Sequence, residues 1–267
     1  SSVPKDIEQL WCHVDHSERH QDLVNMIAQY GGALNLVFCN TKIDCAEVAK
    51  ELSRNNIAAA ALHGDMEQKE RNNTVVRFSN GSIKVLVATD VAARGLDIDD
   101  VDAVINFTLP HQPETYVHRI GRTGRKGKSG RAISLVSSRE MNRLQHIEEF
   151  LGHEVSRCAS PKNDPSAAKS LPAYGTIEIN GGRKHKLRPG DVLGALTANG
   201  SVAGESVGKI DLMDQITYVA IARQELRAAL DCLNNHQIKG KVFRARLSVR
   251  AKPFVRVHRD ETGPDHP

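Results

Sequence analysis

The stretch Val85-Leu-Val-Ala-Thr-Asp-Val-Ala-Ala-Arg-Gly-Leu-Asp-Ile98 joins a short apolar run to a polar loop. Four consecutive apolar residues, 85–88, are typical of a strand that is buried on both faces of a parallel sheet. The loop after this strand offers a hydroxyl group at Thr89, a flexible glycine at Gly95 and a carboxylate at Asp97. Open α/β sheets bind their ligands just past the strand ends, so the stretch predicts a parallel sheet with a binding edge.

Strand and helix patterns alternate on both sides of this stretch. Apolar runs that predict strands lie at 10–14, 34–39, 57–62, 85–88, 103–107 and 132–136. Amphipathic stretches that predict helices lie at 17–30, 42–55, 67–78, 113–120 and 139–151. Such alternation predicts an α/β fold in which helices cover both faces of a parallel sheet.

The second half of the chain has a different organisation. Residues 153–171 are rich in Ser, Pro and Asn and lack periodicity, as is typical of a linker. Strand, helix, strand, strand, helix and strand patterns then follow at 175–180, 189–198, 208–212, 216–221, 224–234 and 241–249. We therefore predict four parts, namely an α/β domain, a linker, a smaller βαββαβ domain of the RRM type and a disordered tail, at 1–152, 153–171, 172–252 and 253–267.

Composition narrows the class of protein. The 267 residues, 40% of them hydrophobic and 25% charged, are enough for two modest globular domains. No run approaches the roughly 18 apolar residues of a membrane span, and the first residues lack a signal-peptide pattern and suggest a piece of a longer protein. The five cysteines are odd in number and form no Cys-x-x-Cys pair, which indicates neither disulfides nor a metal site. We expect a cytoplasmic protein.

Charge is distributed unevenly between the halves. Residues 1–155 hold 18 Lys and Arg against 21 Asp and Glu, whereas residues 156–267 hold 18 against 11. The halves thus carry −3 and +7, which together give the net charge of +4. This asymmetry indicates that the second half contacts a polyanion.

Three arginines follow one another at intervals of three in the segment Tyr116-Val-His-Arg-Ile-Gly-Arg-Thr-Gly-Arg125. These are Arg119, Arg122 and Arg125. Guanidinium groups remain charged at physiological pH and carry fixed forks of donors, which suits them to the phosphates of a nucleotide. The alternative is an exposed basic loop on a solvated surface.

Other polar residues lie where predicted strands give way to helices. Asn40 follows the strand at 34–39, and Gly64 follows the strand at 57–62. Arg71 lies in the first turn of the next helix, where the helix dipole favours an anion. We interpret Arg71 as a contact for a phosphate backbone; a solvent-exposed helix arginine is the alternative.

Four segments, Leu36–Lys42, His63–Arg71, Val87–Ile98 and Tyr116–Arg125, resemble in sequence and order the motifs of the second RecA-like domain of DEAD-box RNA helicases. The resemblance covers about residues 5–152. It implies that Arg122 and Arg125 reach the γ-phosphate of ATP, that Gly95 and Asp97 contact the nucleotide, and that His118 and Arg119 couple this domain to an N-terminal RecA-like domain. It also implies a set of RNA contacts at Asn40, Gly64, Arg71 and Thr89.

The sequence contains only half of the expected catalytic motifs. A Walker A loop requires Gly-x-x-x-x-Gly-Lys-Ser/Thr, and the fragment Gly127-Lys128-Ser129 has Arg122 where the first glycine belongs. No Asp-Glu-Ala-Asp sequence is present. We therefore expect ATP and Mg²⁺ binding to need another domain, and the chain alone to be inactive.

The smaller domain departs from ordinary RRM chemistry. RRM sheets usually stack bases on aromatic residues of their central strands, and here only Tyr218 lies near such a position. Its basic residues instead predict binding of folded RNA through phosphates and shape. With Tyr218, the predicted RNA contacts are Arg183, Lys184, Lys186, Arg188, Lys209, Lys239, Lys241, Arg244 and Arg246. The alternative for each is a solvated surface charge.

A DEAD-box core followed by this kind of RRM resembles the DbpA family of bacterial RNA helicases. The resemblance implies a large-subunit ribosomal RNA hairpin as partner and a role in ribosome assembly. Two other functions stay open from the residues alone: a non-catalytic RNA-binding or RNA-chaperone module, and a DNA translocase of the same superfamily. The incomplete Walker loop favours the module for the isolated chain, whereas Arg122 and Arg125 favour an ATPase.

Overall fold

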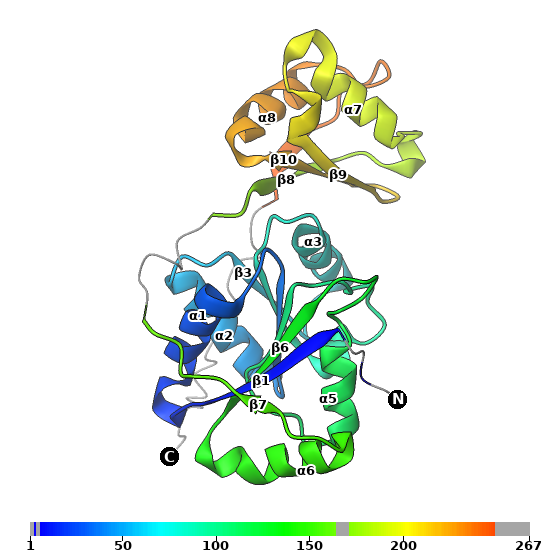
Figure 1. Ribbon diagram of the computed structural model, residues 1–267. Helices are drawn as coiled ribbons and strands as arrows, with labels where there is room; N and C mark the ends of the chain where they lie inside the picture. Colours follow the sequence, from blue (N-terminus) through cyan, green and yellow to red (C-terminus); the bar gives the residue numbers. More distant parts are fainter. Residues whose placement is uncertain (1–2, 4–5, 164–170, 249–267) are drawn as a thin grey trace, which may run out of the picture.

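The structure is a computed structural model that describes residues 3, 6–163 and 171–248. It contains two domains, each built around its own sheet (Figure 1). The predicted tail at 253–267 and residues 164–170 of the predicted linker lie outside the described residues.

The first domain is a seven-stranded sheet in the order β3-β4-β2-β5-β6-β1-β7. Its neighbouring strands pair in parallel, as the alternating pattern predicts. Its strands are β1 (Ile7–His13), β2 (Asn35–Cys39), β3 (Ala59–Leu62), β4 (Val85–Thr89), β5 (Ala103–Asn106), β6 (Gly130–Val136) and β7 (Ser156–Arg157). Its helices are α1 (Arg19–Tyr30), α2 (Lys42–Arg54), α3 (Gln68–Ser79), α4 (Asp90–Ala93), α5 (Pro113–Ile120) and α6 (Met141–Leu151).

The central strands of this sheet are buried on both faces. All five residues of β2 are buried, and neighbouring residues enter different apolar clusters: Val37 one cluster, Leu36 and Phe38 another. Successive strand residues point to opposite faces, so helices must cover both faces of the sheet.

Among the described residues, none of the helices combines the length and the apolar character that a membrane span requires.

Two elements of this domain go beyond what the sequence patterns predict. The short strand β7 lies within the predicted linker and pairs with β1, and Cys158 N donates to Trp11 O at 2.8 Å. The first domain therefore extends several residues beyond 152. The single-turn helix α4 follows β4 directly, with Thr89 as its N-cap.

The second domain has the predicted βαββαβ order. Its elements are β8 (Tyr174–Ile179), α7 (Pro189–Thr197), β9 (Val207–Leu212), β10 (Thr217–Ala222), α8 (Leu226–Asn235) and β11 (Ala245–Leu247). The antiparallel sheet has the order β11-β8-β10-β9. The residues Ile177 and Val219 face α7 and α8 within one apolar cluster. Strand β11 is shorter than the predicted strand at 241–249.

The other face of the second sheet lies against α3 of the first domain (Figure 1). Asn80, which follows α3, donates from Nδ2 to Thr176 Oγ1 at 2.9 Å, and the hydroxyls of Ser82 and Thr176 are 2.7 Å apart. Asn73 of α3 bonds the Ser248 hydroxyl. We call this contact the sheet–α3 interface. It gives the second sheet covering layers on both faces.

Candidate functional site

The three arginines of the segment 116–125 have different environments. Helix α5 begins at Pro113, a favourable first helical residue, and ends before Gly121. Arg119 therefore belongs to the helix, whereas Arg122 and Arg125 lie in the turns that follow it. This difference separates a buried structural arginine from two that retain contact with solvent.

Arg119 is 1% exposed, and all five of its N–H donors are used. Nε and Nη2 donate to the two carboxylate oxygens of Asp90, each at 2.7 Å. The remaining donors reach Asn106 Oδ1 at 3.1 Å, Thr108 O at 2.8 Å and Asn40 Oδ1 at 2.8 Å. The guanidinium also lies over the ring of Phe38, 5.1 Å from its centroid. Arg119 thus ties the ends of three neighbouring strands together within the domain. None of its donors is left for the coupling to an N-terminal RecA-like domain that the resemblance implies.

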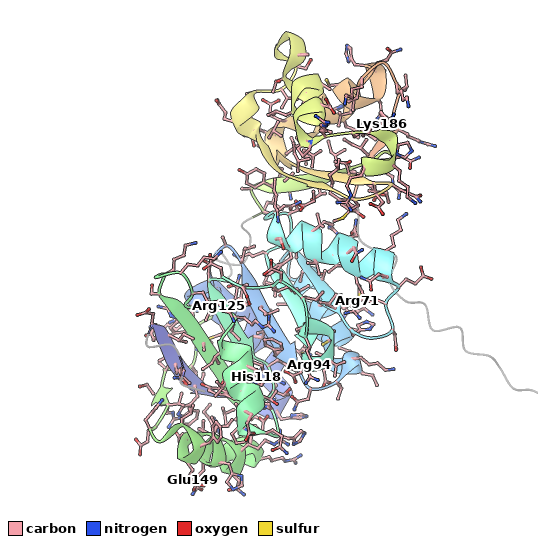
Figure 2. All side chains as sticks on the ribbon, turned by 90° about the vertical axis from the view of Figure 1, so that its right-hand side faces the viewer. Arg71, Arg94, His118, Arg125, Glu149 and Lys186 are labelled. Atoms are coloured by element: carbon pink, nitrogen blue, oxygen red, sulfur yellow. The ribbon has the colours of Figure 1, made fainter. Side chains whose placement is uncertain are left out.

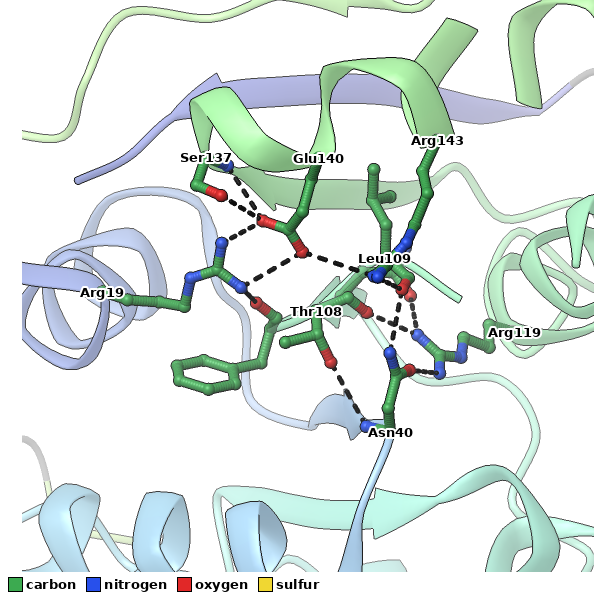
Figure 3. Close-up of polar contacts among 10 residues, drawn as sticks. Arg19, Asn40, Thr108, Leu109, Arg119, Ser137, Glu140 and Arg143 are labelled. Carbon is green, nitrogen blue, oxygen red and sulfur yellow. Dashed lines mark hydrogen bonds and ion pairs between the residues drawn. The ribbon is translucent and has the colours of Figure 1, made fainter. Parts of the chain in front are cut away.

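Two further arginines hold the loop after β5 (Figure 3). Arg19 Nη1 donates to Phe107 O at 3.0 Å, and Arg143 Nη1 donates to Leu109 O at 3.2 Å. With Arg119 on Thr108 O, three arginines bond three successive carbonyl groups. This loop is therefore fixed in place.

Glu140 anchors the Arg19 end of this network. Its carboxylate pairs with Arg19 and accepts bonds from Ser137 N at 3.0 Å and Ser137 Oγ at 2.9 Å. Burial raises the pKa of Glu140, but the Arg19 and Ser137 hydrogen bonds outweigh it and hold the pKa below its usual range. The carboxylate stays ionised and paired at neutral pH.

Arg122 and Arg125 share one carboxylate. Arg122 Nη1 lies 3.2 Å from Asp99 Oδ1, and Arg125 Nη1 pairs with Asp99 Oδ2. Their side chains are 21% and 46% exposed, so both reach the surface (Figure 2 labels Arg125). The two guanidiniums are thus close enough together for a single anion to bridge them.

The position of this pair on the sheet differs from the expectation. The sequence predicts binding residues past the carboxyl ends of the strands, where Thr89 lies. Thr123 instead forms a parallel bridge with Val101, just before β5 begins, and Gly130 N donates to Asp6 O at the start of β1. Arg122 and Arg125 therefore lie beside the amino ends of β1, β5 and β6, because α5 returns the chain across the sheet.

The remaining predicted nucleotide residues lie on exposed loop and helix positions. Gly95 and Asp97 are exposed in the loop after α4, and Gly95 has a φ of +76°, which favours glycine. His118 is exposed on α5. The structure leaves all three accessible to a ligand or a neighbouring domain.

The predicted RNA contacts of the first domain are partly committed to internal bonds. Asn40 uses its side chain on Leu109 O and Arg119, so this amide has a structural role here. Thr89 Oγ1 caps α4 by accepting from Ala92 N at 3.3 Å. Arg71 Nη2 donates to Ala92 O at 3.2 Å, while its buried Nε has no partner among the described residues. Gly64 is exposed, with open space around its Cα.

The basic residues of the second domain lie on its loops and edges. Lys186, Lys239 and Lys241 line a cavity of about 220 Å³ with Leu187 and Phe243, among others. Lys186 and Lys239 have left-handed backbones, with φ of +59° and +52°. Such strain in non-glycine residues often accompanies binding sites. The exposed basic residues of this domain also include Lys184, Arg188, Lys241 and Arg244.

Several of the predicted contacts are paired within the domain, and among the cavity lysines Lys239 pairs with Asp191 at 3.3 Å. Arg183 pairs with Asp214, Lys209 with Asp211, and Arg246 with Glu178, at N–O distances of 3.0, 3.6 and 2.9 Å. Only the Arg183–Asp214 pair is exposed on both sides, and such a pair is weak and can exchange with a phosphate.

Tyr218 is not placed as a stacking residue. It is 2% exposed, because the first domain covers its face of the sheet. The prediction of Tyr218 as an RNA contact therefore disagrees with this arrangement.

Within the described ranges, no three His, Cys, Asp or Glu side chains lie close enough together to hold a metal ion.

Comparisons with known proteins match both domains. The helicase conserved C-terminal domain matches residues 18–127, and the DbpA RNA-binding domain matches residues 176–247. The ATP-dependent RNA helicases DbpA of Escherichia coli and Bacillus subtilis are 43% and 34% identical to the chain, over 90% and 77% of its length. These matches cover 52% and 47% of the two helicases, so the chain spans about half the length of these curated relatives.

A solved structure matches the first domain. The crystal structure of the E. coli DEAD-box protein SrmB bound to RraA gives a TM-score of 0.56 at 36% identity. The match covers 60% of this chain and 97% of that one.

Proposed function

Because the chain belongs to the DEAD-box family, with a helicase C-terminal domain followed by a DbpA RNA-binding domain, we propose that it forms the C-terminal part of an ATP-dependent RNA helicase. Its activity would be RNA-stimulated ATP hydrolysis coupled to the remodelling of RNA duplexes. An N-terminal RecA-like domain of the same protein would supply the phosphate-binding loop and hold Mg²⁺.

The observation that carries this proposal is the pair of guanidiniums at Arg122 and Arg125. Two of their N–H groups converge on the two oxygens of one carboxylate, which is the geometry that two oxygens of a phosphate group require. The exposed carboxylate of Asp97 is available to accept bonds from a ribose. The residues present thus fit a nucleoside triphosphate.

In the proposed mechanism, ATP and RNA bring this domain against the N-terminal one. Arg122 and Arg125 then stabilise the charge that develops on the transferring phosphate, and Thr89 and Arg71 contact the RNA backbone. His118, exposed on α5, would contact the neighbouring domain. Arg119 would act indirectly by bonding Asp90, next to Thr89, and so holding the segment that follows β4.

We assign the second domain to RNA targeting. The exposed lysines around the cavity at Lys186, Lys239 and Lys241 support a phosphate-binding surface. A hairpin of large-subunit ribosomal RNA is the proposed partner, ribosome assembly the proposed process and the cytoplasm the proposed location. The covered face of the sheet directs this binding to loops and edges.

The catalytic proposal is tested by Arg122→Ala and Arg125→Ala in the complete protein. Each change removes one positive charge that would stabilise the transition state, so we expect RNA-stimulated ATP turnover to fall by about 10³-fold or more. Arg139→Ala, which removes an exposed arginine beyond β6, is the matched control. Unaltered turnover in both the Arg122 and the Arg125 variant would refute the proposal. Stimulation by RNA, DNA or neither separates a helicase from a DNA translocase and from a non-catalytic module.

The targeting proposal is tested by Lys186→Ala together with Lys241→Ala in this chain. Binding of a ribosomal RNA hairpin should weaken, and the slope of log affinity against log salt should fall by about 0.7 to 0.9 for each phosphate that the variant no longer neutralises. Lys50→Ala, an exposed lysine on α2, serves as control. Equal salt slopes in the double variant and the control would argue against this surface.

A further inference from the structure

One carboxylate, Asp99, separates two cations that would otherwise repel each other. Asp99 Oδ1 accepts from Arg122 and Asp99 Oδ2 accepts from Arg125, so each oxygen serves one guanidinium. Two positive charges face one negative charge, and a net positive charge remains at the surface. Asp99 thus occupies the point between the guanidiniums where two oxygens of a phosphate would lie.

The backbone fixes Asp99 in this position. Val101 N donates to Arg122 O at 3.2 Å, and the Thr123 hydroxyl donates to Val101 O, which joins the loop of Asp99 to the arginine segment. Asp100 pairs with Lys128 at 3.0 Å and has a φ of +65°. A left-handed backbone is uncommon for a residue other than glycine. The surrounding bonds hold the loop in this strained form.

Each arginine also has a partner that does not depend on Asp99. Arg122 Nη1 donates to Leu96 O at 3.2 Å, and Arg125 Nε donates to Gly121 O at 2.6 Å. If the carboxylate were displaced, these carbonyl groups would keep both guanidiniums near their present positions. The contacts therefore allow one anion to be exchanged for another without dismantling the site.

We propose that Asp99 is a positioning residue that takes the place of a phosphate group between Arg122 and Arg125 until nucleotide binds. The inference rests on the proposed function of these two arginines and adds a group that competes with the nucleotide for them. Phosphate oxygens displace the carboxylate on binding. After hydrolysis, Asp99 competes with the product phosphates for the same donors and so favours their release.

The test compares Asp99→Asn with Asp100→Asn in this chain. Both changes remove one negative charge from adjacent positions, but Asp100 pairs with Lys128 instead of the arginines. The probe is inorganic tripolyphosphate, followed by the NMR signals of the Arg122 and Arg125 Nε–H groups. We expect Asp99→Asn to bind it about 3- to 10-fold more tightly than the wild type, the range of two partly exposed ion pairs, and Asp100→Asn to stay within about twofold.

The outcomes separate this inference from the proposed function. Equal affinities for the two variants, with tripolyphosphate still perturbing Arg122 and Arg125, would overturn the role of Asp99 and leave the phosphate site standing. No perturbation of either arginine in any variant would overturn both.

Kinetics of the complete protein give a second test. Asp99 competes with ATP for the two arginines, so Asp99→Asn should lower KM for ATP by about 3- to 10-fold. A fall in kcat at constant KM would instead indicate a structural role and contradict the proposal.

Discussion

The two sheets of this molecule differ in which of their surfaces are covered and which stay accessible. The first sheet is covered by helices on both faces, so its accessible groups lie on loops at the strand ends, where Asp97 and Arg125 are exposed and Arg122 is partly exposed. The helices of the second domain lie on one face of its sheet, and that arrangement normally leaves the other face open for RNA. Here α3 of the first domain covers that face.

The difference shows that the accessible surface of a domain depends on its fold and also on which face a neighbouring domain covers. The loops of the first domain are kept in place by buried arginines. In the second domain, the sheet face that is open in an ordinary RRM forms the contact with the first domain, and the basic loops remain exposed. Three substitutions test the two sides of this comparison.

The largest effect is expected from Arg119→Ala in the first domain. The change leaves the Asp90 carboxylate and Asn106 Oδ1 without their bonds to the guanidinium. The carboxylate is 28% exposed, so we expect a loss of about 3 kcal/mol, the low end for a buried ion pair. The free energy of unfolding can be measured from the fluorescence of Trp11, the single tryptophan, which lies in β1. Arg54→Ala, which breaks an exposed pair with Glu51, should cost less than about 1 kcal/mol. A similar loss in both variants would show that Arg119 does not organise the loops.

A smaller effect is expected from Thr176→Val at the sheet–α3 interface. Valine matches the shape of threonine but leaves Asn80 and Ser82 without a buried partner, which should weaken docking by about 1–3 kcal/mol. Nitrogen-15 relaxation would then report separate tumbling of the two domains. Thr197→Val, on α7, removes a hydroxyl that bonds only within its helix and is the control. If both variants tumble as one body, these bonds do not hold the domains together.

The smallest effect concerns pH and the network at Glu140. Its pKa is lowered in the folded state, so the pair with Arg19 contributes stability above the unfolded value of about 4.3 and loses it as pH falls through the folded value. Glu140→Gln should flatten the dependence of the unfolding free energy on pH in this acidic range. Glu149→Gln, an exposed change on the following helix α6, should leave the dependence unchanged. An unaltered slope in Glu140→Gln would exclude the network as its source.

The fold and the family could be predicted from the sequence because both depend on local signals. Buried parallel strands appear as short apolar runs, and the motif segments are contiguous. The structure confirms the α/β domain followed by a βαββαβ domain. Strand β7 escaped prediction because a two-residue strand, Ser156–Arg157, has no periodicity to detect.

The roles of individual polar residues were harder to predict. Arg119, Arg122 and Arg125 are equally spaced in sequence, but the end of α5 at Ile120 places the first inside the domain and the others outside it. The partners of Arg119 come from three distant segments, so pairing depends on the tertiary fold. For Tyr218 a signal did exist. The strand Thr217–Ala222 has no charged residue on either face, which is typical of a strand buried on both sides.

Helix α3 also sets a length. Arg71 lies in its first turns and Asn80 directly follows its last, nine residues further along the chain. At 1.5 Å per residue this separation is about 14 Å along the helix axis. The second domain contacts α3 along this length, at Asn73 and at Asn80, so the helix fixes where the docked domain lies relative to the carboxyl-end loop at Arg71. An RNA that contacts both the second domain and Arg71 would have to fit this fixed placement.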